Sequence, residues 1–179
     1  MTGNRLEADF FQKDVLVVAP QLIGKILVRQ FLNEHIERFR ITETEAYRGE
    51  EDLACHASKG RTSRTEVLFH PGGKVYVYLI YGMYQMLNFV TFCENIPQAV
   101  LIRGIEGFDG PGKLTRHLKI DKTFYGEDLA TSERIWVEND EVLFPYTTGP
   151  RVGVDYAGEW KDKPWRFILS SPGKNPGRK

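Results

Sequence analysis

Three side chains that could carry out acid–base chemistry lie at alternate positions of one predicted strand. The composition of residues 37–47 favours a strand, whose geometry places Glu43, Glu45 and Tyr47 on one face. Two acids beside an aromatic residue are unusual on a core-facing surface, but they are expected where a strand lines a polar cleft. A carboxylate with an arginine nearby can polarise and aim a water molecule. Arg103 interrupts the apolar run of another predicted strand and is a candidate partner for these acids.

Each of these residues also has a purely structural interpretation. Glu45 could be an ion-paired strand residue, and Arg103 could be the structural partner of Glu43 or Glu45. His56 lies in a predicted loop over Gly49–Arg64, where it could contact a substrate or form only a backbone hydrogen bond. The residue types alone leave these alternatives open.

The densest aromatic stretch of the chain predicts a β-hairpin. Val75–Ile80 and Leu87–Phe92 have the composition of strands, and a glycine between them lets the chain turn sharply. The predicted turn consists of Tyr81, Gly82, Met83 and Tyr84. Large aromatic and apolar side chains at an exposed turn usually have a use. One use is a wedge inserted between stacked bases, and the alternative is that the tyrosines are ordinary half-buried sheet residues.

Strands dominate the rest of the chain. Residues 10–23 hold an apolar run that favours a strand, although Asp14 could equally cap a short helix. A helix is predicted over Gly110–Leu118 and a helical turn over Thr65–Phe69. The further predicted strands are Lys25–Leu32, Ala99–Ile105, Arg134–Val137, Arg151–Val154 and Trp165–Leu169. Together they predict an α+β fold: one domain over residues 1–179, with a curved, largely antiparallel β-sheet, flanking helices and the protruding hairpin.

Length and composition limit the classes of protein to consider. The chain has 179 residues, which suits one domain with one core. Its 24 basic and 24 acidic residues give a net charge of zero, so binding to nucleic acid would need a local basic surface. No apolar run approaches the ~20 residues that span a bilayer, and the N-terminus does not resemble a signal peptide. We therefore expect a cytoplasmic protein without a membrane partner.

Motifs for several other chemistries do not occur in the sequence. It contains no P-loop, no dinucleotide-binding fingerprint and no nucleophile elbow. Cys55 and Cys93 are too few for a disulfide scaffold, and the adjacent pair Cys55-His56 does not have the ligand spacing of a zinc site. We expect no metal and no organic cofactor. The remaining candidate groups suit attack of water on a sugar carbon that carries a flat leaving group.

Several blocks of the sequence together resemble the alkyladenine DNA glycosylase family, also called 3-methyladenine or methylpurine DNA glycosylases. The blocks follow the family's order from Phe10 to Leu169. They are Glu43–Tyr47, His56, Tyr76–Tyr84, Asn88, Arg103, Gly110–Leu114 and Arg151–Gly158. The chain lacks the basic N-terminal extension of longer members, so it is similar to the compact bacterial type. Ser63, Tyr84 and Gln85 depart from the pattern of relatives, which affects the expected substrate range.

The resemblance implies roles in catalysis and base binding. Glu45 would act as the general base that activates the hydrolytic water, and Arg103 would help to hold that water. Asn88 would disfavour normal guanine, whose amino group would collide with it or stay without a partner. The walls around the flipped base would be Tyr47, His56 and Tyr78.

The resemblance also implies a DNA-binding surface at the hairpin. Tyr81, next to Gly82 in the turn, would enter the minor groove and fill the gap that the flipped base leaves. Met83 and Tyr84 would press on the opposite strand, and Arg61 would contact a backbone phosphate.

These roles imply a monofunctional DNA glycosylase of base excision repair that acts as a monomer on double-stranded DNA. It would release alkylated or deaminated purines (3-methyladenine, 7-methylguanine, ethenoadenine and hypoxanthine) and leave an abasic site. No lysine falls in the matching blocks near Glu45, which argues against Schiff-base chemistry. The fold also resembles the C-terminal tRNA-binding domain of formyltransferases, so the alternative is a non-catalytic nucleic-acid-binding module. A binding module has no need of a carboxylate in a cleft, so Glu45 and Arg103 favour the enzyme.

Overall fold

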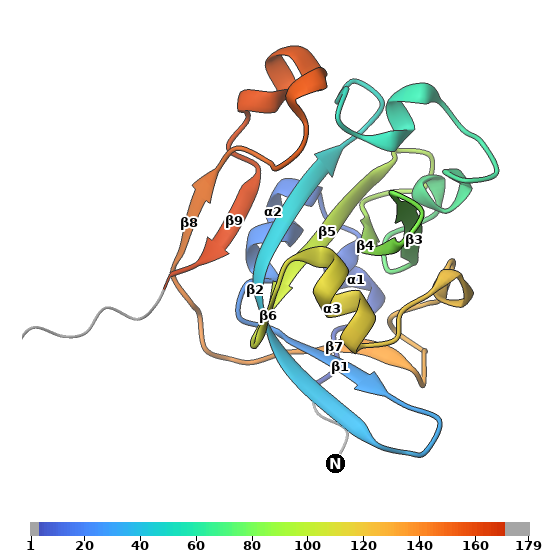
Figure 1. Cartoon of the computed structure of the whole chain (residues 1–179), viewed down its shortest axis with the longest axis vertical. Helices are drawn as coiled ribbons and strands as arrows, with labels where there is room; N and C mark the ends of the chain where they lie inside the picture. The colour runs from blue at the N-terminus through green and yellow to red at the C-terminus, as the bar shows by residue number, and fades with distance from the viewer. Residues whose placement is uncertain (1–3, 171–179) are drawn as a thin grey trace, which may run out of the picture.

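Among residues 4–170, nine strands pair into one strongly curved sheet (Figure 1). The computed structural model describes residues 4–170, and every strand pair within them is antiparallel. The strand order is β3-β4-β5-β2-β1-β7, while β9 pairs with β2, β8 with β9 and β6 with β5. The strands are β1 (Ile26–Gln30), β2 (Ile36–Arg48), β3 (Val75–Ile80), β4 (Tyr84–Thr91), β5 (Gln98–Ile105), β6 (Phe108–Asp109), β7 (Ile135–Glu138), β8 (Tyr146–Gly149) and β9 (Arg166–Leu169).

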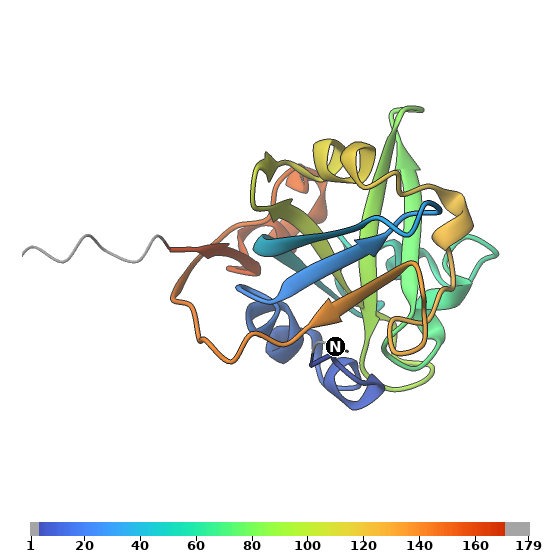
Figure 2. The same cartoon turned by 90° about the horizontal axis from the view of Figure 1, so that it is seen from below.

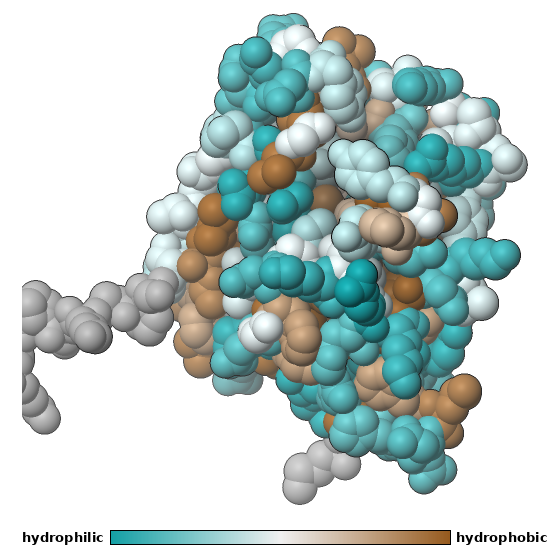
Figure 3. Space-filling view, viewed as in Figure 1, coloured by the Kyte–Doolittle hydropathy of each residue, from teal (hydrophilic) through white to brown (hydrophobic). Residues whose placement is uncertain are grey.

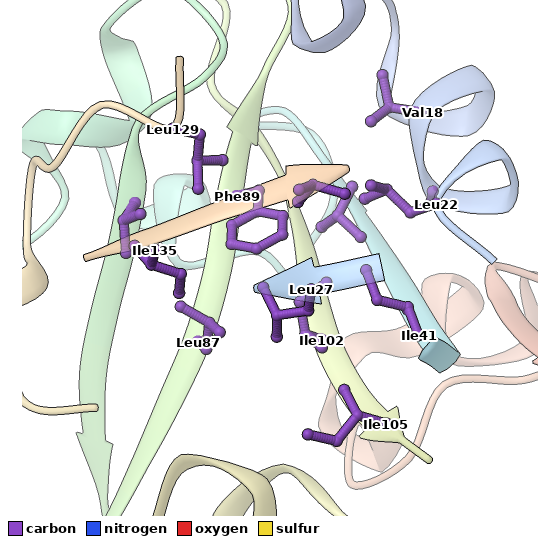
Figure 4. Packing of buried hydrophobic residues seen from close by; sticks show 14 of the residues in the cluster. Val18, Leu22, Leu27, Ile41, Leu87, Phe89, Ile102, Ile105, Leu129 and Ile135 are labelled. Atoms are coloured by element: carbon purple, nitrogen blue, oxygen red, sulfur yellow. The ribbon is translucent and has the colours of Figure 1, made fainter. Parts of the chain in front are cut away.

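The main core lies on one face of this sheet, and a second, smaller cluster lies on the other. Side chains alternate between the faces along each strand. On β3, Val75 and Val77 belong to the main core, whereas Tyr76 and Tyr78 pack in the second cluster. Figure 4 shows the main core, which includes Phe89 and Ile102 from the sheet and Leu22 from the N-terminal segment. The second face is therefore available for a site.

Short helices cover the main core and connect the strands. The α-helices are α1 (Ala8–Phe11), α2 (Val15–Gln21) and α3 (Pro111–His117), and the 3₁₀ helices are η1 (His56–Lys59), η2 (Glu66–Phe69), η3 (Lys122–Phe124) and η4 (Asp155–Asp162). In α2, Asp14 accepts a hydrogen bond from Leu16 N at 2.9 Å. Val15, Val18 and Ala19 are fully buried at helical spacing, which decides the open alternative for residues 10–23 in favour of a helix.

One predicted strand is wrong. Arg151–Val154 forms a loop, and the strand of this region is β8, which ends before Pro150. Proline cannot donate a hydrogen bond to a strand ladder, and Gly153 has a φ of +74°, outside the extended region. This loop passes beside the C-terminal half of β2 and contributes to the site described below.

The predicted hairpin and fold class are confirmed. β3 and β4 pair from Val75↔Phe89 to Ile80↔Tyr84, and their turn projects from the body of the molecule in Figure 2. The chain thus has an α+β fold with a curved antiparallel sheet, a few short helices and a protruding hairpin.

Candidate active site

The carboxyl group of Glu45 is buried and held from three directions. Its side chain is 0% exposed, on the C-terminal half of β2. Oε1 accepts a hydrogen bond from the backbone N–H of Val152 at 2.7 Å, and Oε2 accepts one from the Tyr47 hydroxyl at 2.8 Å. Arg103 Nε lies 3.5 Å from Oε1. Burial raises the pKa of Glu45, and Arg103, Val152 N–H and Tyr47 partly counter this by favouring the carboxylate.

A second carboxylate, Glu43, shares the same arginine. Arg103 Nε donates to Glu43 Oε1 at 3.0 Å, and Arg166 Nε on β9 donates to the same oxygen at 2.6 Å. The predicted common face of Glu43, Glu45 and Tyr47 is therefore confirmed. Arg103 was considered as a structural partner of Glu43 or of Glu45, and it lies within ion-pair distance of both.

A buried ion pair fixes the loop that supplies Val152. Arg151 Nη1 and Nη2 lie 2.6 and 2.9 Å from the two carboxylate oxygens of Asp52, and both side chains are 0% exposed. Arg151 also donates to the carbonyl of Ala46 on β2, and its guanidinium lies 4.8 Å from the centre of the Tyr47 ring. Sequence reasoning did not find this pair, although Arg151 stands in one of the blocks that carry the resemblance.

Aromatic side chains from separate segments enclose a small pocket beside Glu45. His56 and Tyr78 meet at ring centroids 4.4 Å apart, and His56 Nδ1 lies 2.9 Å from the Tyr76 hydroxyl. The space between them is about 20 Å³, enough for one water molecule. The pocket is lined by Tyr47, Ala54, Cys55, His56, Leu68, Tyr76, Tyr78, Asn88 and Ala99. The four residues predicted to contact a base are thus brought together, and Tyr76 is an additional member.

Asn88 forms part of the floor of this pocket. It is 3% exposed on β4, and its Nδ2 donates to the carbonyls of Tyr76 and Met86, each at 3.2 Å. Two backbone acceptors therefore fix the orientation of its amide.

The pocket keeps His56 in its neutral form. Burial, together with Arg64 and Lys59 nearby, lowers the pKa of His56 to about 4. An unfolded chain has an ordinary histidine pKa near ~6.5, so between these two values the unfolded state binds a proton that the folded state does not. His56 therefore contributes stability above pH ~6.5 that is lost as the pH falls toward 4.

A histidine substitution makes this dependence measurable. Wild type should lose more unfolding free energy than His56→Gln when the pH falls from 7 to 5, because the variant has no proton to exclude at this position. Urea unfolding at the two pH values tests this, with His70→Gln, at a half-buried histidine outside the pocket, as control. Equal losses in wild type and His56→Gln would contradict the burial of a neutral imidazole.

The turn that follows β3, the strand of pocket residue Tyr78, carries exposed aromatic and apolar side chains. Tyr81 is 85% exposed and Met83 is 63% exposed. Tyr81 and Gly82 both have positive φ, +52° and +67°, which the tight turn between antiparallel strands requires. In Figure 3 the hairpin points toward the viewer. A pale and tan group projects there, with teal, hydrophilic surface on either side. The prediction of aromatic and apolar residues at an exposed turn is confirmed for these two residues.

Two other predicted residues lie in different surroundings. Tyr84 packs against α3, since a Cβ added to Gly112 would lie only 2.7 Å from its ring. Arg61 is exposed and forms a two-pronged ion pair with Glu66, with the closer contact at 2.6 Å. Arg64 lies nearer to the pocket, with its guanidinium 5.5 Å from the centre of the Tyr78 ring. Contact of Arg61 with a phosphate would compete with Glu66.

Comparison with known proteins identifies the family. A family model described as "Methylpurine-DNA glycosylase" matches residues 9–109 and 107–172. The chain belongs to this family. Membership confirms the resemblance seen in the sequence and supports a DNA glycosylase function, which is a hydrolase activity. Within residues 4–170, no helix has the length and apolar character of a membrane span, and no three His, Cys, Asp or Glu side chains are grouped so that they could hold a metal ion.

Relatives of known name cover nearly the whole chain. Proteins named "Putative 3-methyladenine DNA glycosylase" from Psychrobacter cryohalolentis and Methanocella arvoryzae are 42% and 44% identical to it. The first alignment covers 94% of this chain and 93% of the relative, and the second covers 90% of each. A protein of the same name from Legionella pneumophila is 44% identical over 93% of this chain and 94% of its own. The family assignment therefore applies to the chain as a whole.

Proposed function

We propose that the protein is a monofunctional DNA glycosylase that releases alkylated or deaminated purines from double-stranded DNA and leaves an abasic site. The expected substrates are 3-methyladenine, 7-methylguanine, ethenoadenine and hypoxanthine. One observation carries the proposal: the buried Glu45 carboxylate accepts a hydrogen bond from Tyr47, which lines an aromatic pocket, and Tyr78 of the same pocket precedes an exposed tyrosine at a hairpin turn by three residues. A general base, a place for a flat base and a wedge are the three parts that this reaction requires.

Base flipping gives the hairpin its role. A base inside a duplex is out of reach, so the enzyme must extrude the nucleotide at a cost of a few kcal/mol. Tyr81 enters the minor groove, fills the gap in the stack and prevents the base from returning. Its exposure and its place at the turn support this role.

The aromatic pocket receives the extruded base. Tyr47, His56 and Tyr78 stack around it, and an alkylated purine that carries a positive charge gains roughly 0.5–2 kcal/mol from such rings. The neutral His56 adds no like charge against this cation. Because the space between the rings is only about 20 Å³, the rings must separate when a purine enters. The fixed amide of Asn88 cannot turn aside for the amino group of normal guanine, so guanine is disfavoured.

Hydrolysis then follows at the sugar. The bond from C1′ to the base nitrogen breaks, its electron pair leaves with the base, and the sugar passes through an oxocarbenium-like state. Glu45 stabilises the positive charge on the sugar and takes a proton from the water whose oxygen bonds to C1′. Arg103 helps to hold that water. A purine alkylated at a ring nitrogen carries a positive charge and leaves as a neutral base, so its release needs no acid. Ethenoadenine and hypoxanthine are neutral, so each must take up a proton as it leaves.

The proposal is tested with labelled duplexes that each hold one of the four lesions. Incubation with the protein and then with alkali should cut the labelled strand at the lesion, because alkali cleaves an abasic site. Borohydride should trap no covalent enzyme–DNA adduct, since no amine nucleophile takes part. Binding without cleavage of any lesion would instead support a non-catalytic nucleic-acid-binding module.

The wedge role of Tyr81 predicts the behaviour of Tyr81→Ser. Loss of a stacked ring costs ~1–3 kcal/mol, so affinity for lesion-containing duplex and the rate of base release should fall roughly 10- to 100-fold. Single-turnover rates and fluorescence anisotropy measure both quantities. Leu143→Ser is the control, because Leu143 is 90% exposed and lies outside the hairpin. Unchanged affinity and rate in Tyr81→Ser would rule out the wedge.

A further inference from the structure

Four charged side chains of alternating sign lead from the surface to the buried carboxylate, in the order Arg166, Glu43, Arg103 and Glu45. The first two contacts are hydrogen-bonded ion pairs of 2.6 and 3.0 Å, and the third separates Arg103 Nε from Glu45 Oε1 by 3.5 Å. Exposure decreases along the row: the Arg166 side chain is 29% exposed, those of Glu43 and Arg103 are 15% exposed, and that of Glu45 is 0% exposed. The row connects β9, β2 and β5.

Given the glycosylase activity proposed above, on which this assignment rests, we propose that Glu43 and Arg166 are positioning residues for Arg103 and Glu45. Glu43 holds the Nε side of the Arg103 guanidinium, and Arg166 balances the negative charge that Glu43 brings next to Glu45. Neither residue needs to touch the substrate for this role.

The backbone around Glu43 supports this assignment. The register between β2 and β5 shifts on both sides of Glu43, and such irregularities turn side chains in a new direction. Gly104 lies opposite Glu43, and a Cβ there would come within 2.8 Å of Thr42 Oγ1. A glycine therefore lets the two strands approach closely where Glu43 meets Arg103. On the other edge of β2, Arg166 of β9 lies directly opposite Glu45 in the strand register.

The bond to Glu43 determines which part of Arg103 stays available. Within residues 4–170, Arg103 uses only Nε for its side-chain hydrogen bond, and neither Nη nitrogen bonds another residue. The buried side-chain atoms that have no hydrogen-bond partner do not include either Nη atom of Arg103. The two Nη groups can therefore donate to a water or to the substrate, while Glu43 keeps the guanidinium from turning.

Charge balance gives this row a measurable effect. The charged and titratable groups that face Glu45 are Glu43 and Tyr47 on β2, Arg103 on β5, Tyr78 on β3 and Arg166 on β9, with Arg151 behind the Tyr47 ring. Glu43 raises the pKa of Glu45 as a like charge, although burial has the larger effect. Loss of Arg166 leaves the negative charge of Glu43 without its positive partner, which should raise the pKa of Glu45. Loss of Glu43 removes that negative charge, which should lower the pKa of Glu45. The two losses should therefore shift the ionisation of Glu45 in opposite directions.

The test is the pH dependence of single-turnover base release, with the lesion that wild type releases fastest. Activity requires the Glu45 carboxylate, so it rises with pH through the pKa of Glu45. Arg166→Ala should move this acid limb upward by roughly one pH unit, and Glu43→Gln should move it downward by a similar amount. The double variant should return close to the wild-type midpoint, because its net charge matches that of wild type. Arg166→Lys, which keeps the charge, should also keep the wild-type midpoint.

Matched measurements separate this role from a structural one. Arg38→Ala removes an arginine from the ion pair with Glu138, away from the row, and should leave the midpoint unchanged. If Arg166→Ala and Glu43→Gln lower activity equally at all pH values, or shift the midpoint in the same direction, the assignment is wrong. If wild type releases no lesion, the proposed function fails. Wild-type activity with superimposable pH profiles in all variants would overturn only the positioning role.

Discussion

Glu45→Gln is expected to abolish base release while DNA binding persists. Glutamine has nearly the same shape as glutamate, and its carbonyl oxygen can still accept the hydrogen bond from Val152 N–H. It cannot accept a proton from water, and it carries no negative charge to stabilise the sugar cation. General-base catalysis contributes about 10²–10⁴-fold, and loss of the charge adds to this, so the rate should fall at least ~10³-fold.

Single-turnover base release and anisotropy measure the two quantities separately. The control is Glu106→Gln, which removes an exposed carboxylate at the end of β5 and should match wild type in both assays. Equal base release by Glu45→Gln and wild type would remove Glu45 from the mechanism. Loss of binding together with loss of release would show that the buried carboxylate maintains the pocket.

Asp52→Ala is expected to cause the largest loss of stability. It leaves the Arg151 guanidinium charged, fully buried and without its carboxylate partner, a change that typically costs about 3–5 kcal/mol. It also removes the acceptor for the backbone N–H groups of Arg48 and Ala54. For a chain of this size, ~1 kcal/mol corresponds to about 2–4 °C in Tm, so the Tm should fall by roughly 10 °C.

The same substitution should also slow base release. Val152, whose N–H holds Glu45, directly follows Arg151, so a displaced Arg151 moves this donor. Calorimetry gives the Tm, and single-turnover assays well below it give the rate. Glu66→Ala breaks the exposed ion pair with Arg61 and should leave the Tm almost unchanged. An equally small effect of Asp52→Ala would show that the buried pair does not hold the loop.

Local patterns were sufficient to predict the hairpin and the polar face of β2. Two strand-like runs separated by a short turn with a glycine define β3 and β4, and period-two alternation places Glu43, Glu45 and Tyr47 together. For residues 10–23, local propensity could not choose between strand and helix. The choice depended on burial of Val15, Val18 and Ala19 against the sheet, which is a tertiary effect.

Local sequence patterns could not predict the contacts that hold the site together. Asp52 stands in an acidic run that would ordinarily be a solvated surface, yet it pairs in the interior with Arg151, 99 positions away in the sequence. Val152 contributes a backbone N–H, which is the same for every residue type except proline. The predicted strand over Arg151–Val154 was wrong because its residues have strand-like propensity but turn around the buried guanidinium.

The alternation of side chains along β3 and β4 divides the sheet between two tasks. Val77 and Leu87 pack in the main core, while their neighbours Tyr78 and Asn88 face the pocket. Substitution on the pocket side therefore changes the shape and polarity of the pocket without opening a cavity in the main core. For the proposed glycosylase, lesion preference can therefore change at pocket positions while the main core stays intact.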